Sequence, residues 1–224
     1  MLLDAERHAL ADAGRRLAER GLVIGTSGNL SVRAGDLVAV TPTGGVISEL
    51  TAEQMTVIDL DGAVVDGDLA PTSEVPMHLA VYRATNTAAI AHTHATTSVA
   101  IGLVADEIPV IHYAMLGLGG AVNVAPYACY GTEELAAHVV TALEFKQAAL
   151  MRNHGSIAIG SRLDKAVDNL ELLEWSAQTY HQALLASAVT GQPPRVLTQQ
   201  EQEAVIMAAL STGYGTTKKI NETN

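Results

Sequence analysis

Hydrophobic and polar positions in the first third of the chain predict one helix followed by short antiparallel strands. Apolar residues recur at helical spacing along residues 3–20, and Gly21 is typical of a glycine that ends a helix. Strand-like alternation and turn signals then mark three segments: 30–33, 37–45 and 55–68. We therefore expect an antiparallel arrangement in this part of the fold.

The middle of the chain changes between helical and strand patterns. Helical periodicity marks three segments: 73–85, 96–105 and 132–144. An apolar run at 88–94 predicts a buried strand, and residues 147–160 predict two short strands around a turn at 153–155. Because helices and strands alternate, we interpret the chain as an α/β domain with a mixed or antiparallel sheet.

Two helices are expected in the last third of the chain. The first is long, begins after a capping Ser161 and ends at Gly191. The second begins at Thr198, where Glu201 three residues later completes a capping-box pattern. Residues from about 213 onward are polar, and we expect them to form a mobile tail.

Length and composition narrow the class of protein. A chain of 224 residues fits one domain, 1–224, that buries its core without disulfides. Cys129 is the single cysteine, which excludes an internal disulfide and suits a reducing cytoplasm, and we expect it to be buried. We expect no signal peptide and no membrane span. The net charge of −11, without a basic stripe, argues against a nucleic-acid partner.

The segment AIAHTHATTSVA, residues 89–100, contains the candidate metal ligands His92 and His94. With 8 histidines in the chain, about 0.25 pairs of this spacing are expected by chance, so context must decide. On a strand the two side chains share a face roughly 6.5–7 Å apart, close enough to bind one zinc ion. His154 in the predicted turn is the best third ligand, and Glu74 could supply a carboxylate.

Three segments before this pair combine glycine with hydroxyl residues. They are GTSGN, TPTGG and PTSE, at 25–29, 41–45 and 71–74. Backbone N–H groups and hydroxyls of this kind can hold a phosphate, although the same composition is common in ordinary turns. Since the chain is acidic overall, an anionic ligand would need local positive potential from such N–H groups or from a metal ion.

The order of these motifs resembles the class II aldolase and adducin family. In chain order they are Gly28-Asn29, Thr43-Gly44, Thr72-Ser73-Glu74, His92-Thr93-His94, IHY at 111–113, APYACYGT at 125–132 and NHG at 153–155. The likeness extends over roughly residues 3–190. It implies a three-layer α/β/α sandwich on a mixed, mainly antiparallel sheet. It also implies a homotetramer with active sites at the subunit interfaces.

The same resemblance implies roles for individual residues. One zinc ion per subunit would be bound by His92, His94 and His154. Glu74 would be the catalytic acid/base and would join the metal in the absence of substrate, while Tyr113 of a neighbouring subunit would donate a proton. The substrate phosphate would be held by Gly28, Asn29, Thr43, Gly44, Thr72 and Ser73. Tyr214 corresponds to a tyrosine of the family's C-terminal tail.

The implied reaction is reversible cleavage of a deoxy-ketose 1-phosphate, such as L-fuculose 1-phosphate, to dihydroxyacetone phosphate and an aldehyde such as L-lactaldehyde. The enediolate that cleavage leaves must be stabilised by a lysine Schiff base or by a divalent metal. None of the four lysines follows an apolar strand that would lower its pKa, so the metal route is favoured.

Three alternative functions remain open from the sequence: an epimerase, a dehydratase and a binding module without catalysis. L-ribulose-5-phosphate 4-epimerases and methylthioribulose-1-phosphate dehydratases share the scaffold. The epimerases carry Asp at the position of Glu74 and an Asp near that of Tyr113, so Glu74 and Tyr113 favour the aldolase. An adducin-like binding module without catalysis should have lost metal ligands, and here all three histidines are present.

Overall fold

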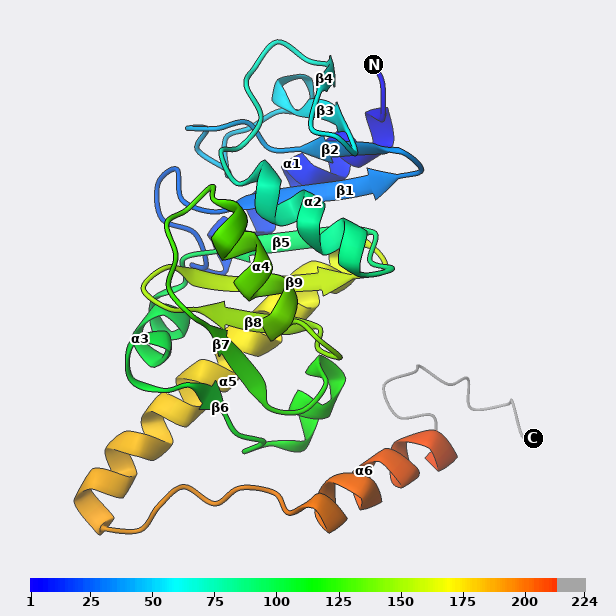
Figure 1. The fold of residues 1–224 in the computed structure, drawn as a ribbon. Helices are drawn as coiled ribbons and strands as arrows, with labels where there is room; N and C mark the ends of the chain where they lie inside the picture. Colours follow the sequence, from blue (N-terminus) through cyan, green and yellow to red (C-terminus); the bar gives the residue numbers. More distant parts are fainter. Residues whose placement is uncertain (213–224) are drawn as a thin grey trace.

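The computed structural model describes residues 1–212, and this part of the chain forms one open sheet flanked by helices (Figure 1). The strands are β1 (Asn29–Ala34), β2 (Leu37–Val40), β3 (Thr56–Asp59), β4 (Val64–Asp66), β5 (Ala89–Thr93), β6 (Glu107–Ile108), β7 (Val122–Ala125), β8 (Ala148–Met151) and β9 (Gly155–Gly160). The helices are α1 (Asp4–Glu19), η1 (Ala52–Gln54), α2 (Val75–Ala84), α3 (Thr96–Val104), η2 (Tyr113–Leu118), α4 (Glu133–Ala142), α5 (Leu163–Thr190) and α6 (Gln199–Thr212).

The sheet is mixed and mainly antiparallel, as the resemblance implied. Its strand order within residues 1–212 is β4-β3-β2-β1-β5-β9-β8-β7-β6. Only the β7–β8 pair is parallel, with Val124 opposite Leu150, and the other neighbours in this order are antiparallel. The order places β1 and β9 on either side of β5, although long stretches of sequence separate these three strands.

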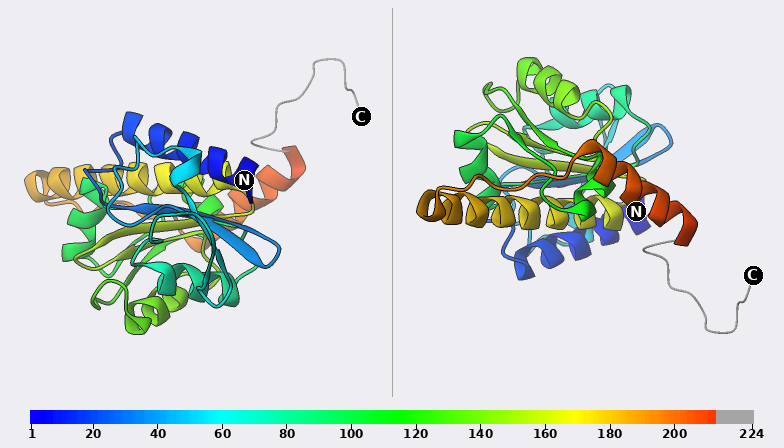
Figure 2. Two further views of the ribbon diagram at one scale, coloured as in Figure 1. Left: turned by 90° about the horizontal axis from the view of Figure 1, so that it is seen from above. Right: turned by 90° about the horizontal axis from the view of Figure 1, so that it is seen from below.

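Helices cover both faces of the sheet, which confirms the three-layer sandwich (Figure 2). Strand alternation produces the two layers: Ala89 and Ala91 of β5 pack in the core beneath α1, α3 and α5, whereas Ile90 packs in the core beneath α2 and α4. In β8 the same alternation sends Ala148 to the first layer and Ala149 to the second. The central strands therefore carry apolar side chains on both faces.

The predicted helices are confirmed, with one correction at an N-terminus. The N-cap position of α5 is Arg162 in extended conformation, with φ −152° and ψ 161°, and not Ser161. Arg162 and the backbone N–H of Lys165 both donate to the Asp164 carboxylate, so the polar groups at this end are partly satisfied without a serine cap. At the other end of α5, Gly191 adopts the left-handed conformation, with φ 72°.

The capping box of α6 is confirmed. The backbone N–H of Thr198 donates to Glu201 Oε2 at 2.9 Å, and the N–H of Glu201 donates to Thr198 Oγ1 at 3.3 Å. In contrast, Cys129 is exposed and not buried as expected. No helix within residues 1–212 is long and apolar enough to cross a membrane. Tyr214 and the polar tail lie outside the described residues.

Candidate active site

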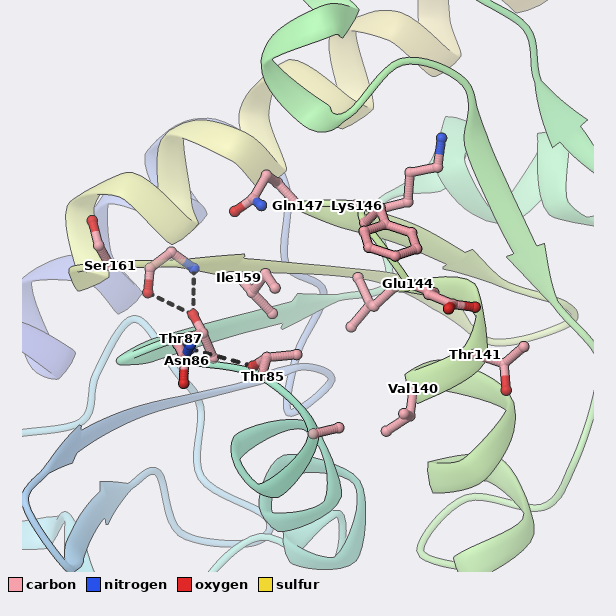
Figure 3. Close-up of a pocket in the computed structure, with 14 residues that line it drawn as sticks. Thr85, Asn86, Thr87, Val140, Thr141, Glu144, Lys146, Gln147, Ile159 and Ser161 are labelled. Carbon is pink, nitrogen blue, oxygen red and sulfur yellow. Dashed lines mark hydrogen bonds between the residues drawn. The ribbon is translucent and has the colours of Figure 1, made fainter.

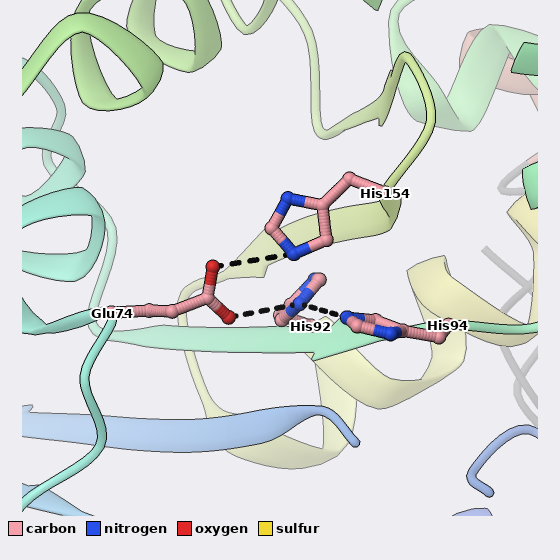
Figure 4. Close-up of side chains that lie close together, drawn as sticks. All are labelled: Glu74, His92, His94 and His154. Atoms are coloured by element: carbon pink, nitrogen blue, oxygen red, sulfur yellow. Dashed lines mark hydrogen bonds and ion pairs between the residues drawn. The ribbon is translucent and has the colours of Figure 1, made fainter. Parts of the chain in front are cut away.

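Three histidines and one glutamate converge at the end of β5 (Figure 4). His92 lies on β5, His94 follows just beyond its last residue, and His154 lies in the turn between β8 and β9. Glu74 occupies the N-cap position of α2. Because β5 and β9 are antiparallel neighbours, with Thr93 opposite Ser156, the end of one strand lies beside the start of the other. This pairing brings His154 to the His92 and His94 pair.

The distances between these side chains fit a metal ion. His92 Nε2 lies 3.0 Å from His94 Nε2 and 3.1 Å from Glu74 Oε2, and His154 Nε2 lies 3.3 Å from Glu74 Oε1. All four ligand atoms are within 4.8 Å of one another. Ligands at about 2.0–2.1 Å from a tetrahedral centre are separated by about 3.3 Å, so the cluster has the dimensions of such a site.

The orientation of His92 is fixed by the backbone of β9. Its Nδ1 lies 2.8 Å from the carbonyl oxygen of Ser156, and because a carbonyl only accepts, Nδ1 must carry the proton. In the neutral ring, Nε2 then presents its lone pair to Glu74 and His94. A cation would stabilise three electron-rich atoms this close together: His92 Nε2, His94 Nε2 and Glu74 Oε2. Histidine metal ligands typically also donate a hydrogen bond through the other ring nitrogen, as His92 does through Nδ1.

Burial sets the charge states of the cluster. Burial, followed by the neighbouring histidine charges, lowers the pKa of His94 and of His154 to about 4, so both rings are neutral near pH 7. For Glu74, burial acts to raise the pKa, but interactions with His92, His154 and Asn29 more than offset it and the pKa is lowered. Glu74 is therefore an ionised carboxylate beside the neutral rings of His94 and His154, which suits a divalent cation.

One oxygen of Glu74 lacks a hydrogen bond. The residue is 5% exposed, and its Oε1 is a buried oxygen without a hydrogen-bond donor among residues 1–212. An ionised oxygen left in this state is costly unless it is paired. A metal ion between the carboxylate and the histidines would pair it, which supports the fit of the cluster to a metal.

Two glycines allow the backbone to approach the histidines closely. Gly28 has φ 92°, and a Cβ there would lie 2.7 Å from the carbonyl oxygen of His92. A Cβ on Gly155 would lie 3.0 Å from His94 Cδ2 and would collide with the carbonyl of Thr93. Any larger residue would displace the backbone that carries the histidines.

The six residues predicted to hold a phosphate lie together in one cavity of about 490 Å³ beside the cluster. They come from three segments: the loop before β1 together with the first residue of that strand, the loop after β2, and the loop before α2. The cavity is also lined by Glu74, His94 and His154. None of its lining residues within 1–212 is Lys or Arg, so attraction for an anion must come from N–H groups, hydroxyls or a bound cation.

Tyr113 is not part of this cavity in the single chain. It begins η2, is 41% exposed, and lines a different cavity together with residues of α6. Its placement by a neighbouring subunit stays a prediction. Two tyrosines that were not singled out from the sequence, Tyr127 and Tyr130, do line the cavity, and both lie in the APYACYGT segment.

A larger cavity of about 660 Å³ lies at the opposite end of β5 (Figure 3). Thr87 precedes β5 there, and its hydroxyl donates to the carbonyl oxygen of Gly160 at 2.6 Å. Glu144 and Lys146 lie on its rim. The histidine cluster and the loops rich in glycine and hydroxyl residues are at the other end of the strand, so this cavity is separate from the candidate site.

Comparison with known proteins finds relatives that match most of this chain. The family model described as Class II Aldolase and Adducin N-terminal domain matches residues 8–181. The chain is 34% identical over 218 residues to the 5-deoxy-D-ribulose 1-phosphate aldolase of Bacillus thuringiensis, covering 96% of this chain and 99% of that protein. It is 37% identical over 216 residues to the L-fuculose phosphate aldolase of Escherichia coli, covering 94% and 97%.

The fold comparison gives the same result. A solved structure of an L-fuculose 1-phosphate aldolase superposes on this chain with a TM-score of 0.84 at 35% sequence identity. The match covers 91% of this chain and 95% of that one.

Proposed function

Because the chain belongs to the class II aldolase and adducin family, we propose that it is a zinc-dependent aldolase acting on a deoxy-ketose 1-phosphate such as L-fuculose 1-phosphate. The products are dihydroxyacetone phosphate and an aldehyde such as L-lactaldehyde. The observation that carries this proposal is the cavity in which the histidine cluster, an ionised Glu74 and three loops rich in glycine and hydroxyl residues meet. A metal and a phosphate site side by side suit a phosphorylated ketose.

The metal would be held by His92, His94 and His154, with Glu74 as an additional ligand when substrate is absent. When bound, the ion supplies Lewis-acid stabilisation of negative charge on the substrate oxygens. Zinc is proposed because histidine nitrogens and one carboxylate are a donor set that it prefers. A histidine binds a metal through a neutral ring, so three histidine ligands would leave the charge of the ion undiminished and the site electron-withdrawing.

The phosphate would be bound at the far end of the same cavity. Its candidate donors are the hydroxyls of Thr43 and Ser73 and the backbone N–H groups of Gly44 and Ser73. None of these four groups donates to an acceptor within residues 1–212. Ser73 and Glu74 are adjacent at the N-terminus of α2, where the helix dipole favours an anion. The loop before α2 would therefore contact the phosphate and also place the acid/base.

Glu74 would move the proton at the reacting carbon. In the condensation direction its carboxylate removes a proton from the hydroxymethyl carbon of dihydroxyacetone phosphate, and the electron pair left behind forms the enediolate. That carbon then attacks the aldehyde carbonyl carbon, and Tyr113 of a neighbouring subunit donates a proton to the aldehyde oxygen. Exchange with water returns both groups to their starting states. This arrangement requires an oligomer with shared sites, and we propose that it is a homotetramer that acts in the cytoplasm.

A substrate screen tests the proposal. The purified protein is incubated with phosphorylated and unphosphorylated ketoses, and dihydroxyacetone phosphate is detected. We expect turnover only with phosphorylated ketoses, together with about one zinc per subunit by elemental analysis. Epimerised or dehydrated products without dihydroxyacetone phosphate would refute the aldolase and favour the related enzymes. A protein without metal and without turnover would favour an adducin-like binding module.

Glu74→Gln is the decisive variant. It keeps the size of the side chain and removes its basicity, so turnover should fall by about 100-fold or more while zinc remains bound by the histidines. Unchanged turnover would remove Glu74 from the mechanism. Light scattering measures the assembly, and a monomer with full activity would contradict a site completed by a neighbouring Tyr113.

A further inference from the structure

A continuous line of buried hydrogen bonds runs from Glu74 into the interior of the protein, away from the cavity. Asn29 Nδ2 donates to Glu74 Oε2 at 2.8 Å, and Asn29 Oδ1 lies 2.5 Å from His78 Nε2. His78 Nδ1 lies 2.6 Å from Ser31 Oγ, which lies 2.7 Å from the hydroxyl of Tyr82. Each of these side chains is at most 5% exposed.

The line exists because α2 lies along β1 with matching repeats. Glu74, His78 and Tyr82 are spaced four residues apart on one side of the helix, a rise of about 6 Å per step. Asn29 and Ser31 are two residues apart on one face of the strand, a rise of roughly 6.6–6.8 Å. Side chains from the helix and the strand therefore alternate along the line.

The direction of every hydrogen bond in this line follows from its two ends. An ionised carboxylate only accepts, so Asn29 turns its NH₂ toward Glu74 and its carbonyl toward His78. His78 must then donate through Nε2. Burial lowers the pKa of His78 to about 4, so the ring is neutral and its Nδ1 accepts from the hydroxyl of Ser31.

Tyr82 is the donor at the end of the line farthest from Glu74. The single hydroxyl proton of Ser31 is used by His78, so the oxygen of Ser31 accepts from Tyr82. Burial raises the pKa of Tyr82, so the phenol keeps its proton. If the amide of Asn29 turned over, two acceptors would face each other at Glu74 and two donors at His78, all of them buried.

We propose that His78, Ser31 and Tyr82 are positioning residues that lock the amide of Asn29 and thereby assign different tasks to the two oxygens of Glu74. Oε2 is held by Asn29, whereas Oε1, which has no hydrogen-bond donor within residues 1–212, exchanges the proton with the substrate carbon. This inference rests on the proposed role of Glu74 as the acid/base. The locked amide of Asn29 explains why the Glu74 carboxylate has this orientation, which the histidine cluster alone does not explain.

Two substitutions of His78 separate positioning from packing. In His78→Gln the side-chain amide reaches the place of Nε2 and can still donate to Asn29. In His78→Asn the shorter amide reaches only the place of Nδ1, so the bond to Asn29 is lost. Tyr82→Phe removes the first donor of the line with a minimal change of shape. Thr56→Val is the matched control, because the buried hydroxyl of Thr56 donates to the carbonyl of Leu69 outside the line.

The main readout is the proton step alone. Dihydroxyacetone phosphate is incubated with the zinc-loaded protein in D₂O, and exchange at its hydroxymethyl carbon is followed by NMR. We expect His78→Asn to slow exchange and kcat by about 10- to 100-fold, with KM and zinc content unchanged. Tyr82→Phe should slow them in the same direction to a smaller extent. His78→Gln should recover most of the lost rate, and Thr56→Val should behave as the unmodified protein.

A second readout needs no substrate. Long-range ¹H–¹⁵N spectra of histidine-labelled protein report which ring nitrogen of each histidine carries the proton. We expect His78 to be neutral, with its proton on Nε2, at pH values near 7. A proton on Nδ1, or a charged ring, would overturn the direction of the line whatever the activity is.

The outcomes distinguish this inference from the proposed function. If Glu74→Gln is inactive but His78→Asn exchanges deuterium at the normal rate, the positioning role is wrong and the aldolase proposal stands. Equal losses in His78→Asn and His78→Gln would assign His78 to packing and would also overturn the inference. If the unmodified protein acts on no ketose phosphate, the function fails, and the spectra still decide the direction of the hydrogen bonds.

Discussion

Acidification should destabilise the metal-free protein through His78, by an amount that follows from its burial. The side chain is 1% exposed, and burial lowers its pKa from 6.5 to about 4, while the charge of Glu74 acts in the opposite direction and that of His92 in the same direction as burial. The unfolded chain has the ordinary pKa, so between these values the unfolded state binds a proton that the folded state does not. This contribution to stability is complete above pH 6.5 and is lost as the pH falls toward 4, for a total of about 3 kcal/mol.

The assay compares the unmodified protein with His78→Gln after removal of metal by a chelator. The free energy of unfolding is measured in urea at several pH values from about 7.5 to about 4.5. Glutamine does not titrate, so the variant should lose less stability over this range, by about 3 kcal/mol at most. His94 and His154 titrate in both proteins, and their effects cancel in the comparison. Parallel curves for the two proteins would refute the reasoning.

Three further perturbations test the framework of the site. Gly155→Ala should lower the free energy of unfolding in urea by about 2 kcal/mol and weaken zinc binding in a metal titration. The reason is that its Cβ would collide with the carbonyl of Thr93 and crowd His94. Glu174→Ala should lower the free energy of unfolding by about 2–4 kcal/mol in the same assay, because the buried Glu174 carboxylate accepts from the Ser98 hydroxyl and from the first N–H groups of α3. An unchanged free energy of unfolding would contradict this role of Glu174 in capping α3. Removing the metal should abolish turnover and lower the melting temperature, with both recovered on addition of zinc; turnover that persists would exclude a metal-dependent reaction.

The sequence alone was sufficient to single out the candidate ligands and to predict most of the elements. His92, His94, His154 and Glu74 could be proposed because they occur together in the order of the family's motifs, whereas each of them alone also has an ordinary structural interpretation. The helices were predictable because their apolar stripes and end signals are local properties of the chain. The strands β6 and β7 and the short helices η1 and η2 were not predicted.

Other features depend on contacts between distant segments. The strand order brings β1 and β9 beside β5, and only this order joins the loops that precede β1 and α2 to the turn that carries His154. The line from Tyr82 to Glu74 likewise depends on how closely α2 lies on β1, which a helical period does not encode. Local spacing therefore determined which side chains share a face. Packing of the helices on the sheet determined which of those faces meet, because burial and hydrogen bonding are satisfied only in the assembled fold.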